Sequence, residues 1–215
     1  MEKHPAIALK LSFRFRKIGA AKYHSHHDMM RFFDRALKRA KLPVRQTEGF
    51  NPRPRMVFPH ALSLGIQSNC EEIEVEFTRY SNPNIYYDAL RKACEPMIEL
   101  THVTVLQPTR RGRIVKRSIY KIDGPTDISV ENAINTIANA KSIYIKRGSV
   151  SEEREVEIRQ YIEYIEIRNG FIWLALSHDE KGCGRADEIV KQIAAHTKKD
   201  FTSWTITREQ IDWVI

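Results

Sequence analysis

The sequence has few cysteines and no long hydrophobic run, and both absences exclude whole classes of protein. None of its apolar runs reaches the roughly 18 residues that cross a bilayer, so we expect no membrane-spanning helix. The first residues also lack the long apolar core of a signal peptide. Cys70, Cys94 and Cys183 are far apart and odd in number, which predicts neither a disulfide framework nor a zinc site. A reducing, cytoplasmic compartment is the simplest interpretation.

Acidic residues are scarce in the first third of the chain. Residues 1–65 hold 14 Lys and Arg against 4 Asp and Glu, a balance of +10. Residues 66–215 hold 21 against 23, a balance of −2, so the formal net charge of +8 comes from the first third. This asymmetry predicts one basic surface whose usual partner is a polyanion.

Hydrophobic periodicity predicts an order of strands and helices in the first half. Residues 6–17 alternate apolar and polar side chains, as in a half-buried strand with a basic polar face. Residues 28–41 have helical spacing, and Asp28 stands where a carboxylate can cap free backbone N–H groups. The further segments that we predict are a short strand over 42–47, extended chain over 56–64, a strand over 71–78, a helix over 83–95 and a strand over 99–107.

The second half repeats this pattern without a sequence repeat that can be aligned. After a linker at 108–113, we predict a strand over 114–122, a helix from Ser129 to about 140, extended chain over 142–148, one or two strands over 155–167, a strand over 171–177, a helix over 184–197 and a strand over 201–208. The Gly182-Cys183-Gly184 segment is interpreted as a turn. We therefore predict an α+β fold of two ferredoxin-like (βαββαβ) halves, residues 1–108 and 109–215, with antiparallel sheets and helices on one face.

Motifs in the first half carry a resemblance. The sequence has Ser25-His26-x-Asp28, then Gly49-Phe50-Asn51-Pro52-x-Pro54, then Leu62-x-Leu64-Gly65. These motifs resemble the uncharacterised bacterial domain family that is encoded beside, or fused to, cobalamin-binding-type radical SAM proteins. The resemblance extends over nearly the whole chain and implies a radical SAM partner and, by association, a role with RNA.

The sequence departs from the family pattern at several motif positions. Thr47-Glu48 stand where Ser-Gln is more usual, and Arg53 and Arg55 stand where His and Lys are often found. An apolar residue is usual at His27. The basic replacements keep a capacity to bind anions, whereas the loss of a histidine at position 53 argues against chemistry that needs an imidazole there.

The basic helix and the loop that follows it are the candidate RNA-binding surface. Arginine binds phosphate through a planar fork and stacks on bases, which suits the helix flank, the basic strand face and the loop. Phe50 and Tyr23 can stack on bases if they are exposed, and two prolines stiffen the loop. The predicted RNA contacts are His26, Arg31, Arg35, Phe50, Asn51, Arg53 and Arg55. The alternatives are that the helix charges form a solvated face and that Asn51 is only a turn former.

The histidine-rich turn admits three interpretations. Ser25, His26 and Asp28 can form a hydrogen-bonded cap that holds the turn, His26 can contact RNA, or His26 with Asp28 can act as acid and base in RNA cleavage. His24, His27 and His60 also invite a metal reading, but their spacing matches no named metal signature, and we predict no metal site.

These patterns favour an RNA-binding accessory module over an enzyme. The chain lacks the CxxxCxxC ligands of a radical SAM cluster, so we expect no cofactor of its own. The leading prediction is that it presents tRNA or rRNA to a radical SAM partner. The alternatives are a metal-independent endoribonuclease that uses His26, and a protein-interaction subunit of the radical SAM enzyme that makes no contact with RNA.

Overall fold

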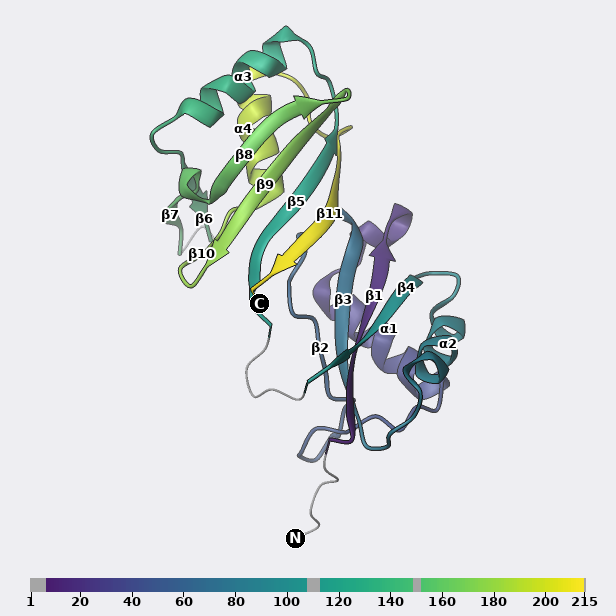
Figure 1. The fold of residues 1–215 in the computed structure, drawn as a ribbon. Helices are drawn as coiled ribbons and strands as arrows, with labels where there is room; N and C mark the ends of the chain where they lie inside the picture. The colour runs from purple at the N-terminus through teal and green to yellow at the C-terminus, as the bar shows by residue number, and fades with distance from the viewer. Residues whose placement is uncertain (1–6, 108–112, 149–151, 215) are drawn as a thin grey trace. The chain divides into compact units, whose positions relative to one another are not determined.

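The computed structural model describes residues 7–107, 113–148 and 152–214 (Figure 1). It has a mixed α/β fold whose strands pair mostly in an antiparallel manner. The chain divides into two compact units, Met1–Ile114 and Val115–Ile215. The linker predicted over 108–113 lies outside the described residues except for Arg113. No helix in the described ranges has the length and apolar character needed to cross a membrane.

In its described residues, the first unit contains four strands, two α-helices and one short 3-10 helix. In chain order they are β1 (Leu9–Lys17), η1 (Gly19–Tyr23), α1 (His26–Arg39), β2 (Met56–Val57), β3 (Gln67–Phe77), α2 (Pro83–Cys94) and β4 (Glu99–Leu106). Strand β1 lies between β3 and β4, and β2 adds to the outer edge of β3. All of these pairs are antiparallel.

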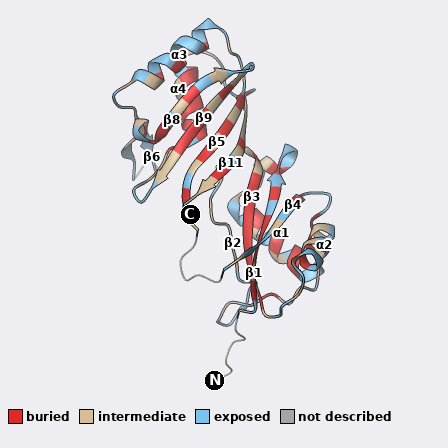
Figure 2. Ribbon diagram, in the orientation of Figure 1, coloured by how far each residue is buried: buried red, intermediate tan, exposed pale blue. Residues whose placement is uncertain are grey.

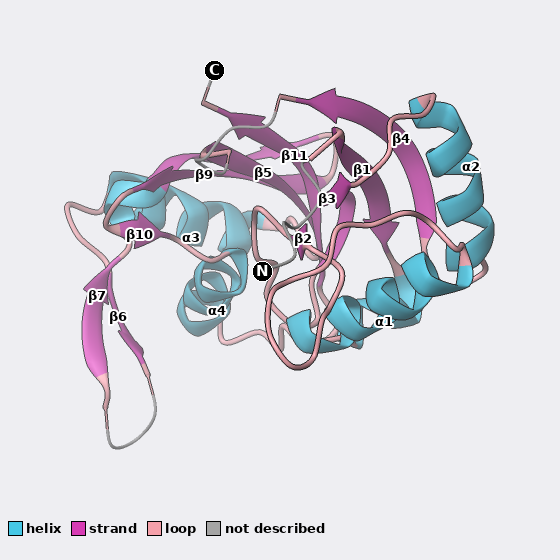
Figure 3. Ribbon diagram, turned by 90° about the horizontal axis from the view of Figure 1, so that it is seen from below, coloured by secondary structure: helices cyan, strands magenta, loops and turns pink. Residues whose placement is uncertain are grey.

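The predicted alternation in β1 is confirmed, and it creates the core of this unit. Leu9, Leu11, Phe13 and Phe15 are buried on one face of the sheet. Helices α1 and α2 pack on that same face (Figures 2 and 3). Their inward side chains join one hydrophobic cluster with those of the strands. Because the apolar stripe of α1 faces inward, its charged side chains must point outward.

The second unit has a larger sheet and a separate two-stranded ribbon. Its elements are β5 (Val115–Asp123), α3 (Ile128–Asn139), β6 (Tyr144–Arg147), β7 (Arg154–Glu157), η2 (Arg159–Tyr161), β8 (Ile162–Arg168), β9 (Phe171–Asp179), β10 (Gly182–Cys183), α4 (Ala186–Thr197) and β11 (Thr205–Trp213). Strand β5 lies between β9 and β11, and β8 and the short β10 pair with β9. The β6–β7 ribbon extends away from this sheet (Figure 3).

Several element boundaries differ from the predictions for local physical reasons. Residues 42–47 form only isolated bridges, and β2 covers two residues of the stretch predicted as extended, because prolines nearby supply no ladder donor. Helix α3 is capped by Asp127 and not by Ser129, whose N–H donates to the Asp127 carboxylate at 3.0 Å. Strand β11 begins at Thr205, since Thr202 N–H donates to Asp200 at 2.9 Å in a turn.

Candidate nucleic-acid interface

Helix α1 begins with a reciprocal cap made by Ser25 and Asp28. The Asp28 N–H donates to Ser25 Oγ at 3.2 Å, while the Asp28 carboxylate accepts bonds from Ser25 Oγ at 2.7 Å and from the Ser25 N–H at 2.9 Å. The hydroxyl bond first, and then the backbone bond, lower the pKa of Asp28. The N-cap is therefore Ser25, and the helix begins at His26 instead of the predicted Asp28.

The histidines lie around this helix start. His26 is exposed, and its ring meets the ring of Phe58 edge-on with centroids 5.3 Å apart. The centroids of the His26 and His27 rings are 6.2 Å apart, and His24 Nδ1 lies 3.2 Å from a backbone oxygen. In the described part of the chain, no three His, Cys, Asp or Glu side chains are grouped so that they could hold a metal ion. A catalytic role of His26 stays a prediction.

An outward stripe of α1 lines one wall of a groove. The stripe consists of His27, Arg31, Asp34 and Lys38, which recur every three or four residues and therefore share one helix face. Arg35 is exposed but is not among the lining side chains. Sequence reasoning did not single out Asp34 or Lys38 as site residues, although their spacing from Arg31 was a sufficient signal.

The loop over residues 47–55 forms the other wall, and hydrogen bonds close its base. The Thr47 N–H donates to the Arg53 carbonyl at 2.8 Å, and the Arg53 N–H donates to Thr47 Oγ1 at 3.0 Å. Gly49 has a φ of +121°, a conformation that suits glycine and strains other residues. Phe50, at the tip, is fully exposed. The loop therefore exposes the Phe50 ring to solvent, while the Thr47–Arg53 hydrogen bonds join the two ends of the loop.

The groove between α1 and this loop has a volume of about 840 Å³. It brings together Arg31, Asn51, Arg53 and Arg55 of the predicted contacts, with Lys38 in addition. Within the described ranges, Arg31 and Arg53 have no ion-pair partner, whereas Arg55 Nε lies 3.3 Å from Glu76 Oε2. The arrangement offers cations to an anionic ligand from both walls.

Comparison with known proteins identifies the family. A family of bacterial proteins matches residues 10–196, which include both motif regions and most of both units. The chain belongs to the family described as "Uncharacterized protein conserved in bacteria (DUF2344)". No curated protein matches it. A solved structure titled "Crystal Structure of an Unknown Protein from Galdieria sulphuraria" is 9% identical, covers 96% of this chain and 99% of its own, and has a TM-score of 0.26, too low to support an argument.

The polar face of β1 in this DUF2344 protein is charge-balanced, which corrects the prediction that it adds to the basic surface. Strand register places glutamates of β3 and β4 beside each cation of this polar face, Lys10, Arg14 and Arg16. The three pairs are Lys10–Glu74 at 2.6 Å, Arg14–Glu72 at 3.2 Å and Arg16–Glu99 at 3.3 Å. Within this unit, the groove is thus a better candidate for an anion-binding surface than the strand face.

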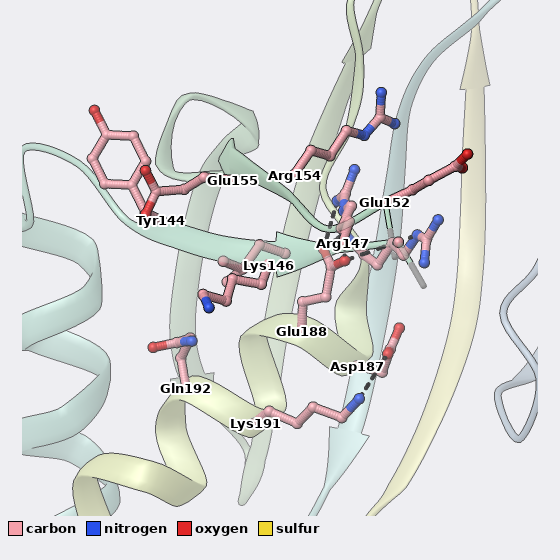
Figure 4. A pocket seen from close by; sticks show the side chains of 13 residues that line it. Tyr144, Lys146, Arg147, Glu152, Arg154, Glu155, Asp187, Glu188, Lys191 and Gln192 are labelled. Atoms are coloured by element: carbon pink, nitrogen blue, oxygen red, sulfur yellow. Dashed lines mark hydrogen bonds and ion pairs between the residues drawn. The ribbon is translucent and has the colours of Figure 1, made fainter. Parts of the chain in front are cut away.

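A second pocket, of about 980 Å³, lies in the other unit between the β6–β7 ribbon and α4 (Figure 4). Five of its nine charged lining side chains form ion pairs with one another. Arg147 from β6 donates to both oxygens of Glu188 at 2.7 and 2.6 Å, and Lys191 lies 3.5 Å from Asp187. The Glu188 carboxylate also accepts the Arg185 N–H at 3.1 Å at the start of α4. Because this helix start has its own carboxylate, it is a poor anion site.

Proposed function

We propose that this chain binds RNA through the groove between α1 and the loop over residues 47–55. The observation that carries the proposal is that Arg31 and Arg53, which form no ion pair within the described residues, lie on opposite walls of one groove. An arginine without an ion-pair partner in the protein binds a phosphate at a lower free-energy cost, because no existing ion pair has to be broken. Exposed Phe50 at the loop tip supports the choice of RNA, since unpaired bases stack on aromatic rings.

We also infer that each unit is a ferredoxin-like half, with a division close to the predicted boundary at residues 108 and 109. The strand order β4-β1-β3-β2, with α1 and α2 on one face, supports this for the first unit. The order β11-β5-β9-β8, with α3 after β5 and α4 before β11, supports it for the second. The β6–β7 ribbon is then an insertion in the second half.

The partner in this proposal is a radical SAM enzyme to which the module presents tRNA or rRNA. This part rests on the resemblance carried by the Ser25-His26-x-Asp28 and Gly49–Pro54 motifs, and on the lack of CxxxCxxC ligands in the chain. We infer that the RNA-binding step belongs to this chain and the radical chemistry to its partner.

The ribonuclease alternative would need His26 to exchange protons with a second group. Asp28, the group that the sequence offers, already accepts two hydrogen bonds from Ser25 and has a lowered pKa. A carboxylate in that state is a weak base and serves the helix start. RNA contact through the groove therefore remains the proposal that the described geometry supports best.

The test is binding of purified protein to total tRNA at about 50 and 200 mM salt. If Arg31, Lys38, Arg53 and Arg55 each release one counterion, wild-type affinity should fall about a hundredfold over this range. The Arg31→Ala/Arg53→Ala variant should bind more weakly than wild type. Its affinity should fall only about tenfold between the two salt concentrations, because two phosphate contacts remain. Phe50→Ala should weaken binding at both salt concentrations alike, since stacking is uncharged.

The matched control is Arg16→Ala/Arg91→Ala, which removes the same charge from exposed arginines that are paired with Glu99 and Glu95. Its salt dependence should equal that of wild type. If the control and the groove variant behave alike, the groove is not the binding surface. If folded wild type binds no RNA, the protein-interaction alternative replaces the proposal. Cleavage of the RNA without added metal, abolished by His26→Ala, would establish the ribonuclease alternative.

A further inference from the structure

The groove contains one acidic side chain among its lining residues, and its position is unusual for an anion-binding surface. Asp34 stands on the outward stripe of α1 between Arg31 and Lys38. A carboxylate there repels phosphate groups and reduces the attraction that the surrounding cations provide. A neutral residue at this position would give a groove that binds only the RNA backbone a higher affinity. The carboxylate therefore needs a separate explanation.

The hydrogen bonding of Asp34 is incomplete. Its Oδ2 accepts a bond from Lys38 Nζ at 2.9 Å. Its Oδ1 is shielded from water and has no hydrogen-bond partner anywhere in the described ranges. An ionised carboxylate has about four acceptor sites, and leaving most of them unused away from water costs free energy. The side chain as a whole is 26% exposed and lines the groove, and a rotation about its Cβ–Cγ bond would turn the shielded Oδ1 toward a ligand there.

A ligand that satisfies both features must carry negative charge for the cations and N–H donors for Asp34. Ribonucleotides combine a phosphate with a base whose edge can donate hydrogen bonds. Guanine presents two adjacent donors, N1–H and the N2 amino group, that match the two oxygens of one carboxylate. Uracil presents a single N–H between two carbonyl oxygens, which a carboxylate repels. Adenine and cytosine present one amino group beside a ring acceptor.

We propose that Asp34 is the base-reading residue of this groove and that it selects an unpaired guanine. The inference rests on the proposed RNA-binding function and adds the identity of the preferred base. The guanine must be unpaired, because its N1–H and N2 amino donors are occupied by cytosine in a duplex. Lys38 keeps the carboxylate oriented from the next turn of the helix, while Arg31 and Arg53 hold the flanking phosphates.

The experiment measures the affinity of wild-type protein for a short oligouridine and for the same oligomer with one central guanosine. We expect the guanosine to increase affinity about tenfold. In Asp34→Asn, which keeps the side-chain shape, this preference should disappear, because the amide presents one acceptor and one donor group. Affinity for oligouridine itself should stay equal or rise, since a negative charge has been removed.

Asp88→Asn is the matched control, because it removes the same charge from an exposed position on α2, outside the groove lining. It should retain the wild-type preference for guanosine. The inference is overturned if wild type binds both oligomers equally, or if Asp34→Asn strengthens binding to both and keeps their ratio. Equal binding would leave the RNA-binding function intact. Failure of wild type to bind either oligomer would instead remove the proposed function, and the inference with it.

Discussion

Replacement of Arg113 by methionine should destabilise the first unit, because this arginine joins two buried carboxylates on the polar face of its sheet. Arg113 Nε donates to Glu74 Oε1 at 2.7 Å, and Nη2 donates to Glu72 Oε2 and, at 3.2 Å, to Ser12 Oγ. The side chains of Glu74 and Glu72 are only 2% and 6% exposed. Methionine keeps most of the aliphatic length and removes the charge.

The size of the effect follows from what remains after the substitution. Breaking a buried ion pair typically costs about 3–5 kcal/mol, because one charge stays buried without its partner. Here Lys10 still contacts Glu74, and Arg14 still contacts Glu72, so the lower end of this range applies. We expect a loss of about 3 kcal/mol, which at a typical urea dependence of about 2 kcal/mol per molar moves the unfolding midpoint by about 1.5 M.

Acidification should reduce this difference. Burial, the largest effect on Glu72, raises its pKa, but hydrogen bonds from Ser12 and Arg113 outweigh it and lower the pKa overall. The stability that Glu72 contributes is therefore present above its ordinary pKa of 4.5 and is lost as the pH falls through the lower folded value. Without Arg113 the folded pKa rises, so wild type loses more stability than the variant on acidification.

The assay is urea unfolding at neutral pH and at about pH 3.5, below the ordinary glutamate pKa. Far-UV circular dichroism follows both units, whereas fluorescence follows the second, since all three tryptophans (173, 204 and 213) lie there. Arg16→Met is the control and should cost less than about 1 kcal/mol, because Arg16 and Glu99 are exposed. A neutral-pH loss no larger than in the control, or a gap that widens in acid, would refute the reasoning.

Two further predictions concern helix starts. Ser25→Ala should destabilise α1 by about 1 kcal/mol, as for other lost N-caps, and Ser25→Asn should restore most of it, which thermal unfolding can compare. If Ser25→Asn lost as much stability as Ser25→Ala, the missing N-cap would not be the cause of the destabilisation. Glu188→Gln should destabilise the second unit by about 2–4 kcal/mol, because Arg147 and Glu188 are mostly buried. Asp187→Asn should cost under about 0.5 kcal/mol in the same tryptophan-fluorescence assay, because the side chains of Asp187 and Lys191 are 30% and 55% exposed.

Local patterns predicted the elements of this fold well where periodicity and burial agree. The alternation through Leu9 and Phe15 identified β1 and its core face, and the helical spacing after Asp28 identified the buried stripe of α1. Helix starts were harder, because several residues near each start can cap. Ser25 with Asp28 three residues later is a capping-box pattern, and reading both members together would have placed the start of α1 at His26.

Charge was the property that sequence order predicted least well. The first third of the chain is strongly basic, but three of its cations lie on the polar face of β1, where strand register sets glutamates from later segments beside them. Register depends on tertiary pairing, so no count along the chain could reveal this neutralisation. Asp34 was not predicted as a site residue for a related reason. In the sequence, one acid in a basic helix resembles an ordinary solvated residue, and only the fold brings the loop over residues 47–55 opposite it.

The groove therefore depends on which charges the fold leaves unpaired and not on the total charge. Strand pairing neutralises the cations on the polar face of β1, whereas α1 faces a loop that brings more arginine and no acid into the groove lining. Asp34, supplied by the helix itself, is the exception within that lining. Unpaired cations raise the affinity for RNA without selecting a base. A carboxylate among them adds base specificity and lowers that affinity somewhat. The two variants test these roles separately: Arg31→Ala/Arg53→Ala should reduce affinity and its salt dependence, and Asp34→Asn should remove the preference for guanosine.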